Sequence, residues 1–547
     1  MADAHHVPVD QTSGGLSHRQ VLVILSGLML GMLLAALDQT IVATALPTIV
    51  GELHGLDRLS WVVAAYLLTT TLSTPLYGKI SDLYGRKRIF QIAIVVFLVG
   101  SALSGLARSM DQLIAFRALQ GLGGGGLMSL AMAIVGDIVS PRERGRYQGY
   151  FGAVFALASI GGPLAGGVLT DHLSWRWIFY INLPVGALAL VITSVVLRLP
   201  QPARKASIDF VGAALAAAAV TPVILVSVWA GTTYAWGSPT ILTLVAVAVV
   251  MTVGLVVRER RAPEPIFPPH VFREPVVRAA LATTFFVTAS MFAVIIYLPL
   301  YLQLVDGESA TRSGVLLLPL MSGMLVSSIL SGRLVTRFGR YKAFPVAGTA
   351  LMGLGMWLFT HLGDHTPLGV TSAYMVVFGV GMGMTLQIVV VAVQNAVDRR
   401  DLGSATSSIS FFRNIGAACG TAVLGAVLVS RSGYWLPRLV PKGTKLQLSK
   451  SFTITPDRLR ALPPAVRNGI VEALVRSLHV VFEVGIPVAA LAFVAAVALR
   501  EIPLQRGPAS EPGPAPADAS DVPAAVGATA AAFEAAQPVA GTRTGPG

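Results

Sequence analysis

The sequence predicts an all-α membrane protein with fourteen transmembrane helices, arranged as two pseudo-symmetric six-helix bundles plus two inserted helices. Three observations predict this class: an apolar composition, basic residues that alternate between successive loops, and an internal repeat. The chain has 547 residues, of which 54% are hydrophobic and only 12% are charged. Soluble proteins carry about 25% charged residues, so a chain this long with half that fraction is not expected to be a soluble enzyme.

Fourteen apolar runs are each long enough to cross a bilayer, which requires about 20 mostly apolar residues. They cover approximately residues 20–46, 58–78, 89–107, 112–136, 147–169, 178–198, 208–230, 239–257, 278–303, 312–332, 343–362, 368–392, 404–430 and 478–500. An even number of crossings places both termini on the same side of the membrane.

The basic residues indicate which side that is. Loops on the side of the termini hold 21 Lys and Arg residues, whereas the short loops on the other side hold four. Cytoplasmic loops carry an excess of Lys and Arg, so both termini are predicted to be cytoplasmic in a plasma (inner) membrane protein. The net charge of +13 thus reports topology, and no nucleic-acid partner is expected.

The loop GKISDLYGRKR (Gly78–Arg88) aligns without a gap with GRLVTRFGRYK (Gly332–Lys342) at an offset of 254 residues. A repeat on one membrane face indicates two halves related by an axis along the membrane normal. The predicted parts are a cytoplasmic segment (1–19), a first bundle (20–199), two inserted helices with a cytoplasmic connector (200–277), a second bundle (278–500) with an outer loop (431–477), and a disordered tail (501–547).

Four charged residues lie five or more residues inside the predicted spans, where an ionised side chain is costly unless it is paired or touches water. Asp38 and Arg117 reach similar depths in the outer half of the bilayer, so they are predicted to pair, either for proton coupling or as a structural ion pair. Arg413 lies near mid-bilayer. Glu483 lies about five residues inside the last span, where it could neutralise Arg413, take a second proton or contact water at the interface.

Two glycine-containing segments are predicted to control helix packing. In ASIGGPLAGG, Gly162, Gly166 and Gly167 leave one face of a span without side chains, while Pro163 bends the helix. In the repeated loop, Gly78 and Gly85 permit the turn between two spans. Its charged members Asp82, Arg86 and Arg88 mark the cytoplasmic side, and the family resemblance given below implies that they form a latch between the bundles.

With these segments, LDQTIVATALP (Leu37–Pro47) and LIAFRALQGLGGGG (Leu113–Gly126) make residues 20–500 resemble the fourteen-span drug:proton antiporter family of the major facilitator superfamily. The resemblance implies export of amphipathic small molecules by alternating access. It further implies that Asp38 and Arg117 act in proton coupling, with Arg413 and Glu483 as weaker candidates, and that GPxxGG is the antiporter motif. The energy source would be the proton gradient, with no cofactor, no metal and no enzymatic activity.

The cargo cavity is expected between the two bundles. Its wall is predicted from polar residues within apolar runs, namely Tyr66, Tyr297, Tyr301, Gln303, Gln387 and Asn414. Expected partners are a small-molecule substrate, protons and membrane lipid, with a monomeric protein. A proton-coupled symporter that imports a nutrient and a non-transporting membrane sensor are the alternatives.

Overall fold

The computed structural model describes residues 18–53, 58–197, 209–231, 233–308, 310–363, 366–441, 459 and 462–504. Regular structure in these residues is helical apart from one isolated bridge between Ala230 and Tyr234. The first group of helices is α1 (His18–Leu53), α2 (Leu59–Tyr84), α3 (Arg86–Gly105), α4 (Met110–Ile138), α5 (Arg144–His172), α6 (Trp177–Tyr180) and α7 (Asn182–Val196).

The remaining helices follow in the same order as the predicted spans. The middle of the chain forms α8 (Phe210–Trp229), α9 (Pro239–Glu259) and the short α10 (Pro269–Arg273). The last group is α11 (Pro275–Leu304), α12 (Ala310–Leu316), α13 (Leu318–Phe338), α14 (Ala343–Phe359), α15 (Leu368–Ala396), the 3₁₀ turn η2 (Arg399–Asp401), α16 (Leu402–Leu439) and α18 (Pro464–Val497).

Twelve helices in the described part of the chain are long and apolar enough to cross a membrane. Two more occupy the places of predicted spans: α14 is apolar but has 17 residues, and α2 has 26 residues with a polar centre that includes Thr69 to Thr71. The valines along α9 are exposed, and apolar side chains of this kind suit contact with lipid. The helix also satisfies its own backbone N–H and C=O groups, as a lipid environment requires. The prediction of an all-helical membrane protein is confirmed, and the count of fourteen spans stays a prediction.

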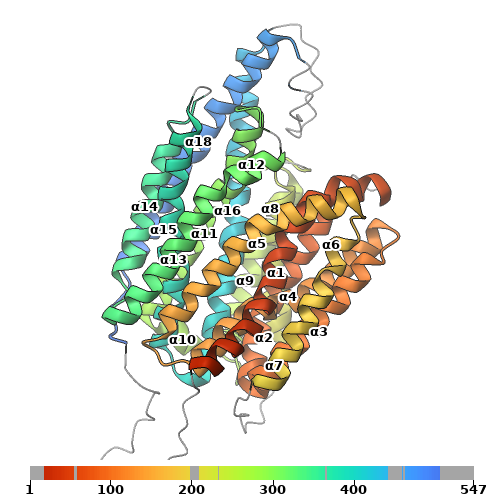
Figure 1. The fold of residues 1–547 in the computed structure, drawn as a ribbon. Helices are drawn as coiled ribbons and strands as arrows, with labels where there is room; N and C mark the ends of the chain where they lie inside the picture. Colours follow the sequence, from red (N-terminus) through yellow and green to blue (C-terminus); the bar gives the residue numbers. More distant parts are fainter. Residues whose placement is uncertain are drawn as a thin grey trace, which may run out of the picture. The chain divides into compact units, whose positions relative to one another are not determined.

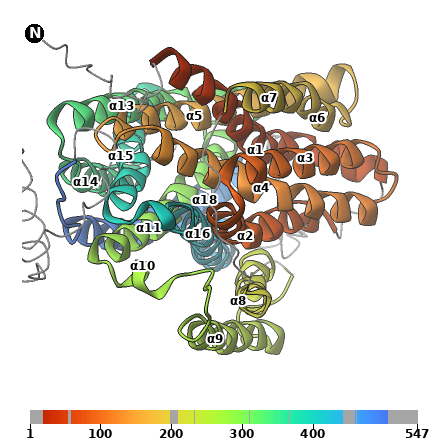
Figure 2. The ribbon, with the colours of Figure 1, turned by 90° about the horizontal axis from the view of Figure 1, so that it is seen from below.

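The helices pack as two groups that meet along a seam. In the first group α4 packs against α1, α2 and α3. In the second group α11 packs against α15, α16 and α18, and α14 packs against α15 and α18. The seam is formed by α5 beside α13 and by α2 beside α16, as Figure 1 and Figure 2 show. We call these groups the N-terminal half (α1–α7) and the C-terminal half (α11–α18), and the end with the basic loops Arg86–Arg88 and Arg337–Lys342 the basic end.

Helices α8 and α9 come between the two halves in the sequence, but in the structure they lie to one side of both (Figure 2). Helix α8 packs against α9 and also against α2 and α16, one from each half. Asp209 and Arg258 join the basic ends of α8 and α9 through an ion pair of 2.9 Å. The hydrogen bond from the Arg258 guanidinium holds the pKa of the Asp209 carboxyl below its usual value.

The connector after α9 contacts both halves. Glu264 forms an ion pair of 2.6 Å with Lys79 of α2, and His270 approaches Asp401 at the start of α16 to 2.9 Å. Phe267 stacks against Phe411 with ring centroids 5.1 Å apart. The proline-rich segment 258–277 therefore follows the surface of the two halves at the basic end.

The predicted outer loop 431–477 is shorter than expected, because helices continue into it from both sides. Helix α16 runs on to Leu439 and α18 already begins at Pro464, while residues 442–458 and 460–461 lie outside the described residues. Arg476 lies over the Trp435 ring at 4.8 Å, which joins the two extensions. Two of the nine basic residues predicted in this loop, Arg438 and Arg476, thus pack on aromatic rings.

The start of the predicted disordered tail 501–547 also differs from expectation. Glu501 accepts hydrogen bonds from the backbone N–H groups of Tyr341 and Lys342, and the Tyr341 hydroxyl donates to the Arg500 carbonyl. Leu504 is buried. Residues 501–504 are therefore bound to the repeated loop of the C-terminal half, and the rest of the predicted tail lies outside the described residues.

Candidate functional site

A buried cluster of three polar side chains occupies the N-terminal half. Arg117 of α4 donates from Nη1 to Asp38 of α1, at 2.5 Å from Oδ2, and to Gln120 Oε1 at 2.8 Å. Gln120 in turn donates from Nε2 to Asp38 Oδ1 at 2.8 Å. The exposed fractions of Asp38 and Gln120 are 0% and that of Arg117 is 1%. Both carboxylate oxygens are thus satisfied by groups of one helix, and the predicted pairing of Asp38 with Arg117 is what the structure contains.

Neighbouring helices enclose this cluster. The Arg117 guanidinium lies 4.2 Å from the centre of the Tyr66 ring, and 5.9 Å from that of Phe179. Arg117 Nε points to the Val62 carbonyl at 3.5 Å. Tyr66, which was predicted to line the cargo cavity, is packed on the cation as a cation–π partner. Sequence reasoning missed Gln120, although its spacing of three residues from Arg117 places it on the same helix face.

The glycine run of α4 allows this close approach. A Cβ at Gly124 would lie 2.8 Å from the Tyr66 hydroxyl, and one at Gly121 would lie 2.5 Å from the Tyr66 carbonyl. A Cβ at Gly123 would crowd the Ala93 carbonyl of α3 at 2.6 Å. Glycines therefore let α4 fit between α2 and α3, and this positions Arg117 beside Asp38.

The GPxxGG segment brings α5 against the same part of α1. A Cβ at Gly162 would overlap the Thr40 hydroxyl, which itself donates to the Ala158 carbonyl at 2.9 Å. Pro163 lies inside the continuous helix α5, and Gly166 is buried. Gly167 has no atom of the described residues within 4 Å of a Cβ placed on it. The tight crossing is therefore made where Gly162 of α5 meets Thr40, which lies two residues along α1 from Asp38. Gly167 takes no part in this crossing.

The first copy of the repeated loop contacts the other half directly. Asp82 accepts hydrogen bonds from the backbone N–H groups of Gly403 at 3.0 Å and Ser404 at 2.9 Å, and from the Ser404 hydroxyl at 3.1 Å. A Cβ at Gly78 would overlap the Ser407 hydroxyl and lie 2.7 Å from the Gly403 carbonyl. Asp82 thus caps the N-terminus of α16, where free N–H donors and the helix dipole favour a carboxylate.

The second copy makes a related contact in the opposite direction. A Cβ at Gly332 would overlap the Gly145 carbonyl of α5, and the Thr336 hydroxyl accepts from the Arg146 backbone N–H at 3.1 Å. Each repeat loop therefore meets the start of a helix in the other half. Thr336 stands where Asp82 stands in the first copy, so the second contact lacks a charged acceptor.

Of the two glycines predicted to permit the turn, Gly85 has a φ of 95°, and its counterpart in the second copy, Gly339, has a φ of 71°. Gly78 does not turn the chain, because it lies inside α2, where it instead lets α16 approach closely. Arg86 is buried and pairs with Asp82 at 3.0 Å and with Asp137 at 2.9 Å. Arg88 is exposed and makes no contact that would join the halves within the described residues. Within the described residues the contact with the other half is made by Asp82, and Arg86 holds Asp82 from its own half.

Two arginines that were counted only as topological markers also join the halves. Arg144 donates to the Gln394 carbonyl of α15 and the Gly136 carbonyl of α4, both at 2.6 Å. Arg142 donates to the carbonyls of Thr336 at 2.9 Å and Arg337 at 2.8 Å. Their carbonyl acceptors leave no sequence signature. Together with Asp82, they close the seam between the halves at the basic end.

The two charged residues of the C-terminal half are not paired with each other. Arg413 of α16 has buried Nε and Nη2 atoms that lack a hydrogen-bond partner within the described residues. Glu483 of α18 is exposed, and the ion pairs found in the described part of the chain do not include Arg413. Of the roles considered for Glu483, neutralisation of Arg413 does not occur in this structure.

The other predicted cavity residues lie in several environments. Tyr297 and Tyr301 are buried, with the Tyr301 hydroxyl donating to the Gly363 carbonyl at 2.7 Å. Gln303 donates to the Ser313 hydroxyl at 2.9 Å. Gln387 is buried and Asn414 is half-buried. Their part in cargo binding stays a prediction.

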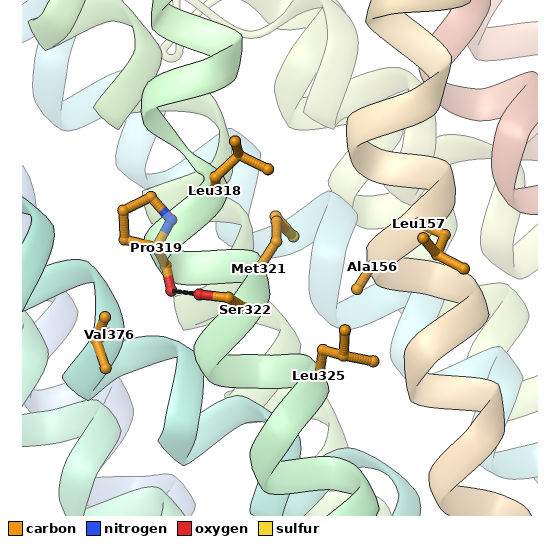
Figure 3. A pocket seen from close by; sticks show the side chains of 8 residues that line it. All are labelled: Ala156, Leu157, Leu318, Pro319, Met321, Ser322, Leu325 and Val376. Carbon is orange, nitrogen blue, oxygen red and sulfur yellow. Dashed lines mark hydrogen bonds between the residues drawn. The ribbon is translucent and has the colours of Figure 1, made fainter.

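A pocket of about 510 Å³ lies on the seam between α5 and α13, and Figure 3 shows its lining. It is formed by Ala156, Leu157, Leu318, Pro319, Met321, Ser322, Leu325 and Val376. The Ser322 hydroxyl donates a hydrogen bond to the Pro319 carbonyl at 2.9 Å, within its own helix. The pocket is therefore apolar, of the size that drug-like molecules occupy, and none of the predicted cavity residues lines it.

Two helical halves that meet along a seam, one of which encloses a paired carboxylate, form the architecture expected of a membrane transporter. No group of His, Cys, Asp and Glu that could hold a metal ion occurs within the described residues. The chain belongs to the Major Facilitator Superfamily, whose family model matches residues 28–421.

Similar proteins agree with this assignment. The chain is 42% identical to an uncharacterised transporter of this superfamily from Mycobacterium tuberculosis, over 88% of this chain and 70% of that protein. It is 37% identical to the multidrug transporter protein MdtP of Bacillus subtilis, over 91% of this chain and 96% of that protein. It is also 36% identical to multidrug resistance protein 3 of the same organism, over 77% and 81% of the two chains.

Solved structures share the fold at low sequence identity. The human organic anion transporter TETRAN superposes with a TM-score of 0.59 at 15% identity, covering 88% of this chain and 99% of that one. The proton:xylose symporter XylE superposes with a TM-score of 0.56 at 14% identity, covering 88% and 96%. The chain is therefore a multi-pass membrane transporter of this superfamily.

Proposed function

We propose that this transporter is a proton-coupled antiporter that exports amphipathic small molecules across the plasma membrane by alternating access. The observation that carries the proposal is the enclosed cluster of Asp38, Arg117 and Gln120, because a buried carboxylate in a membrane transporter is a natural proton site. The names of the two Bacillus subtilis relatives, a multidrug transporter and a multidrug resistance protein, support the class of cargo.

The topology follows from the charge distribution. We assign the basic end to the cytoplasm, with both termini there, and count α2 and α14 among fourteen spans. The functional unit is a monomer that needs no cofactor. One proton charge that moves through 100 mV supplies about 2.3 kcal/mol, enough for a roughly fifty-fold gradient of cargo.

Proton coupling acts through the Asp38 carboxylate. When Asp38 is ionised, it holds Arg117 and Gln120 and joins α1 to α4. A proton taken up from outside removes the charge and weakens the attraction to Arg117. Cargo that arrives from the cytoplasm or the inner leaflet favours release of this proton. Arg117 itself stays charged throughout, because a guanidinium does not lose its proton in proteins.

The coupling can reach the seam through α5. Gly162 packs on Thr40, two residues from Asp38, and the first turn of α5 carries Arg144 and Gly145, which contact the C-terminal half. A shift of α1 against α5 would therefore change the contacts between the halves at the basic end. Asp82, Arg142 and Arg144 stabilise the state that is closed toward the cytoplasm.

The test uses cells that express the protein and are loaded with cationic, neutral and anionic dyes. We expect energy-dependent efflux of at least one dye, abolished by an uncoupler and by Asp38→Asn. The matched control is Asp111→Asn, because Asp111 pairs with Arg58 as an exposed ion pair away from the cluster. Uncoupler-resistant efflux, or cargo accumulation in place of efflux under an imposed pH gradient, would contradict an antiporter.

A further inference from the structure

Arg413 is a half-buried charge within α16 that the proton cycle above does not use. Its Nε and Nη2 atoms are buried without a partner in the described residues, and no ion pair formed by those residues includes it. A guanidinium in the interior of a membrane protein is costly unless something neutralises it. The group that neutralises Arg413 is therefore expected to come from outside the described residues.

Helix spacing relates Arg413 to the contacts of α16. Thr406, Ser410 and Arg413 lie at spacings of four and three residues along α16 and so share one face. On that face, Gln394 Nε2 of α15 donates to the Thr406 hydroxyl at 3.2 Å and to the Met132 carbonyl of α4 at 2.9 Å. At Thr406 this face is therefore linked through Gln394 to the N-terminal half, whereas Gly420, seven residues beyond Arg413, packs on α11.

Gln387 lies at the same level on the neighbouring helix. It precedes Gln394 by seven residues in α15, as Arg413 follows Thr406 by seven in α16, and the two helices run in opposite directions from the turn η2. Seven residues of helix span about 10 Å, so Gln387 and Arg413 each lie about 10 Å along their helix from the Gln394–Thr406 contact, on the side away from the basic end. Gln387 also lies beside α5, since a Cβ at Gly152 would be 3.7 Å from its Cγ.

The unpaired polar atoms at this level include donors suited to an anion. Arg413 Nε and Nη2 and Ser410 Oγ are buried without a partner in the described residues, as is the acceptor Gln387 Oε1. Native structures rarely leave buried polar atoms unpaired, so unpaired atoms at one level of two helices point to a missing ligand. Nε and Nη2 form the side edge of the guanidinium, and this edge donates in parallel to the two oxygens of a carboxylate.

We propose that Arg413, with Ser410 beside it on α16, binds the carboxylate of an amphipathic organic acid, which is the class of cargo. This inference rests on the proposed export function but concerns a different residue from the proton site. Because Asp38 is already paired with Arg117, the interior of the described helices carries one unbalanced positive charge at Arg413. An anionic group on the cargo neutralises it, whereas a cationic cargo would add to it.

The test measures binding to the purified full-length protein in detergent, using pyrene-butyrate and its uncharged amide as probes. We expect wild-type protein to bind the acid about tenfold or more tightly than the amide, since a bidentate charged pair is lost with the amide. Arg413→Gln should remove this preference, and Arg413→Lys should keep only part of it, because an ammonium cannot form the fork. Arg431→Gln, an exposed arginine of the same helix, is the matched control.

Equal binding of acid and amide to the wild type would overturn the proposal, as would binding of neither probe. A preference for the acid that survives Arg413→Gln, or that Arg413→Lys retains in full, would also overturn it. The result is independent of proton coupling. A protein that binds the acid through Arg413 but shows no proton-driven efflux would leave this inference standing and refute the antiporter.

Discussion

The carboxylate of Asp82 caps Ser404, a residue 322 positions away in the other half of the protein. Asp82 Oδ2 accepts from both the backbone N–H at 2.9 Å and the hydroxyl of Ser404 at 3.1 Å. Oδ1 accepts from the neighbouring Gly403 N–H at 3.0 Å. The first turn of α16 is thus capped by α2, so separation of the halves at this end must leave those N–H groups to find other partners.

Asp82→Ala should therefore favour opening at the basic end. Loss of a helix cap costs about 1–2 kcal/mol, which corresponds to about a tenfold shift toward the open state. The readout is the rate of maleimide labelling of Thr406→Cys in a Cys419→Ser background, because Thr406 is buried between the halves here. Asp111→Ala serves as the control. An unchanged labelling rate would show that Asp82 does not hold the seam closed.

Thr336→Ala should have a smaller effect on the same labelling rate. The Thr336 side chain makes one neutral contact across the seam, from the Arg146 N–H, whereas the Asp82 side chain makes three with a charged acceptor. The Thr336 carbonyl, which accepts from Arg142, is unchanged by the substitution. Hydrogen bonds to charged groups are roughly twice as strong as neutral ones. An effect of Thr336→Ala equal to or larger than that of Asp82→Ala would contradict the asymmetry between the two copies of the repeat.

Gly162→Ala and Gly167→Ala form a matched pair within one helix. The methyl group at Gly162 would overlap Thr40, while that at Gly167 meets nothing within the described residues. We expect Gly162→Ala to lower the free energy of unfolding by about 1–3 kcal/mol through overpacking. Gly167→Ala should be neutral or slightly stabilising, because alanine favours the helix. Thermal unfolding in detergent compares them, and equal losses would refute the assigned crossing.

Arg117→Gln should destabilise the protein more than the double variant with Asp38→Asn. The single substitution leaves a buried carboxylate without its cation, a loss of about 3–5 kcal/mol for a broken buried pair. The second substitution removes that charge, so stability should partly recover although proton coupling is gone. Thermal unfolding again provides the measurement. Additive losses in the double variant would mean that the two side chains are energetically independent.

Much of the coupling site could be predicted from the sequence, because membrane depth limits which charges can meet. Asp38 and Arg117 fall at similar depths in their spans, and the structure joins them. The glycines of α4 and the turns at Gly85 and Gly339 also carried readable signals. Gln120 was readable from its spacing but was overlooked.

The contacts across the seam were beyond the reach of sequence patterns. Arg144 binds the backbone carbonyl of Gln394, and any residue type would present that acceptor. Asp82 likewise binds the backbone N–H groups of Gly403 and Ser404, which almost any residue type would present. The contact of Tyr66 with Arg117 was not predicted, because a tyrosine in an apolar run is compatible with a cavity wall and with a cation–π partner alike. Its part in cargo binding stays a prediction. The helical extensions of α16 and α18 were missed because apolarity marks only the part of a helix that lies in lipid.

The most direct test of the central claim compares two transport modes of Asp38→Asn in proteoliposomes. Exchange of labelled for unlabelled cargo requires only that the carrier alternate between its two states, whereas uphill export driven by a pH gradient requires the proton site. If Asp38 is the proton site, we expect Asp38→Asn to retain cargo exchange and to lose pH-driven accumulation together with cargo-linked proton movement. Wild-type pH-driven accumulation by Asp38→Asn would contradict the assignment of Asp38 as the proton site.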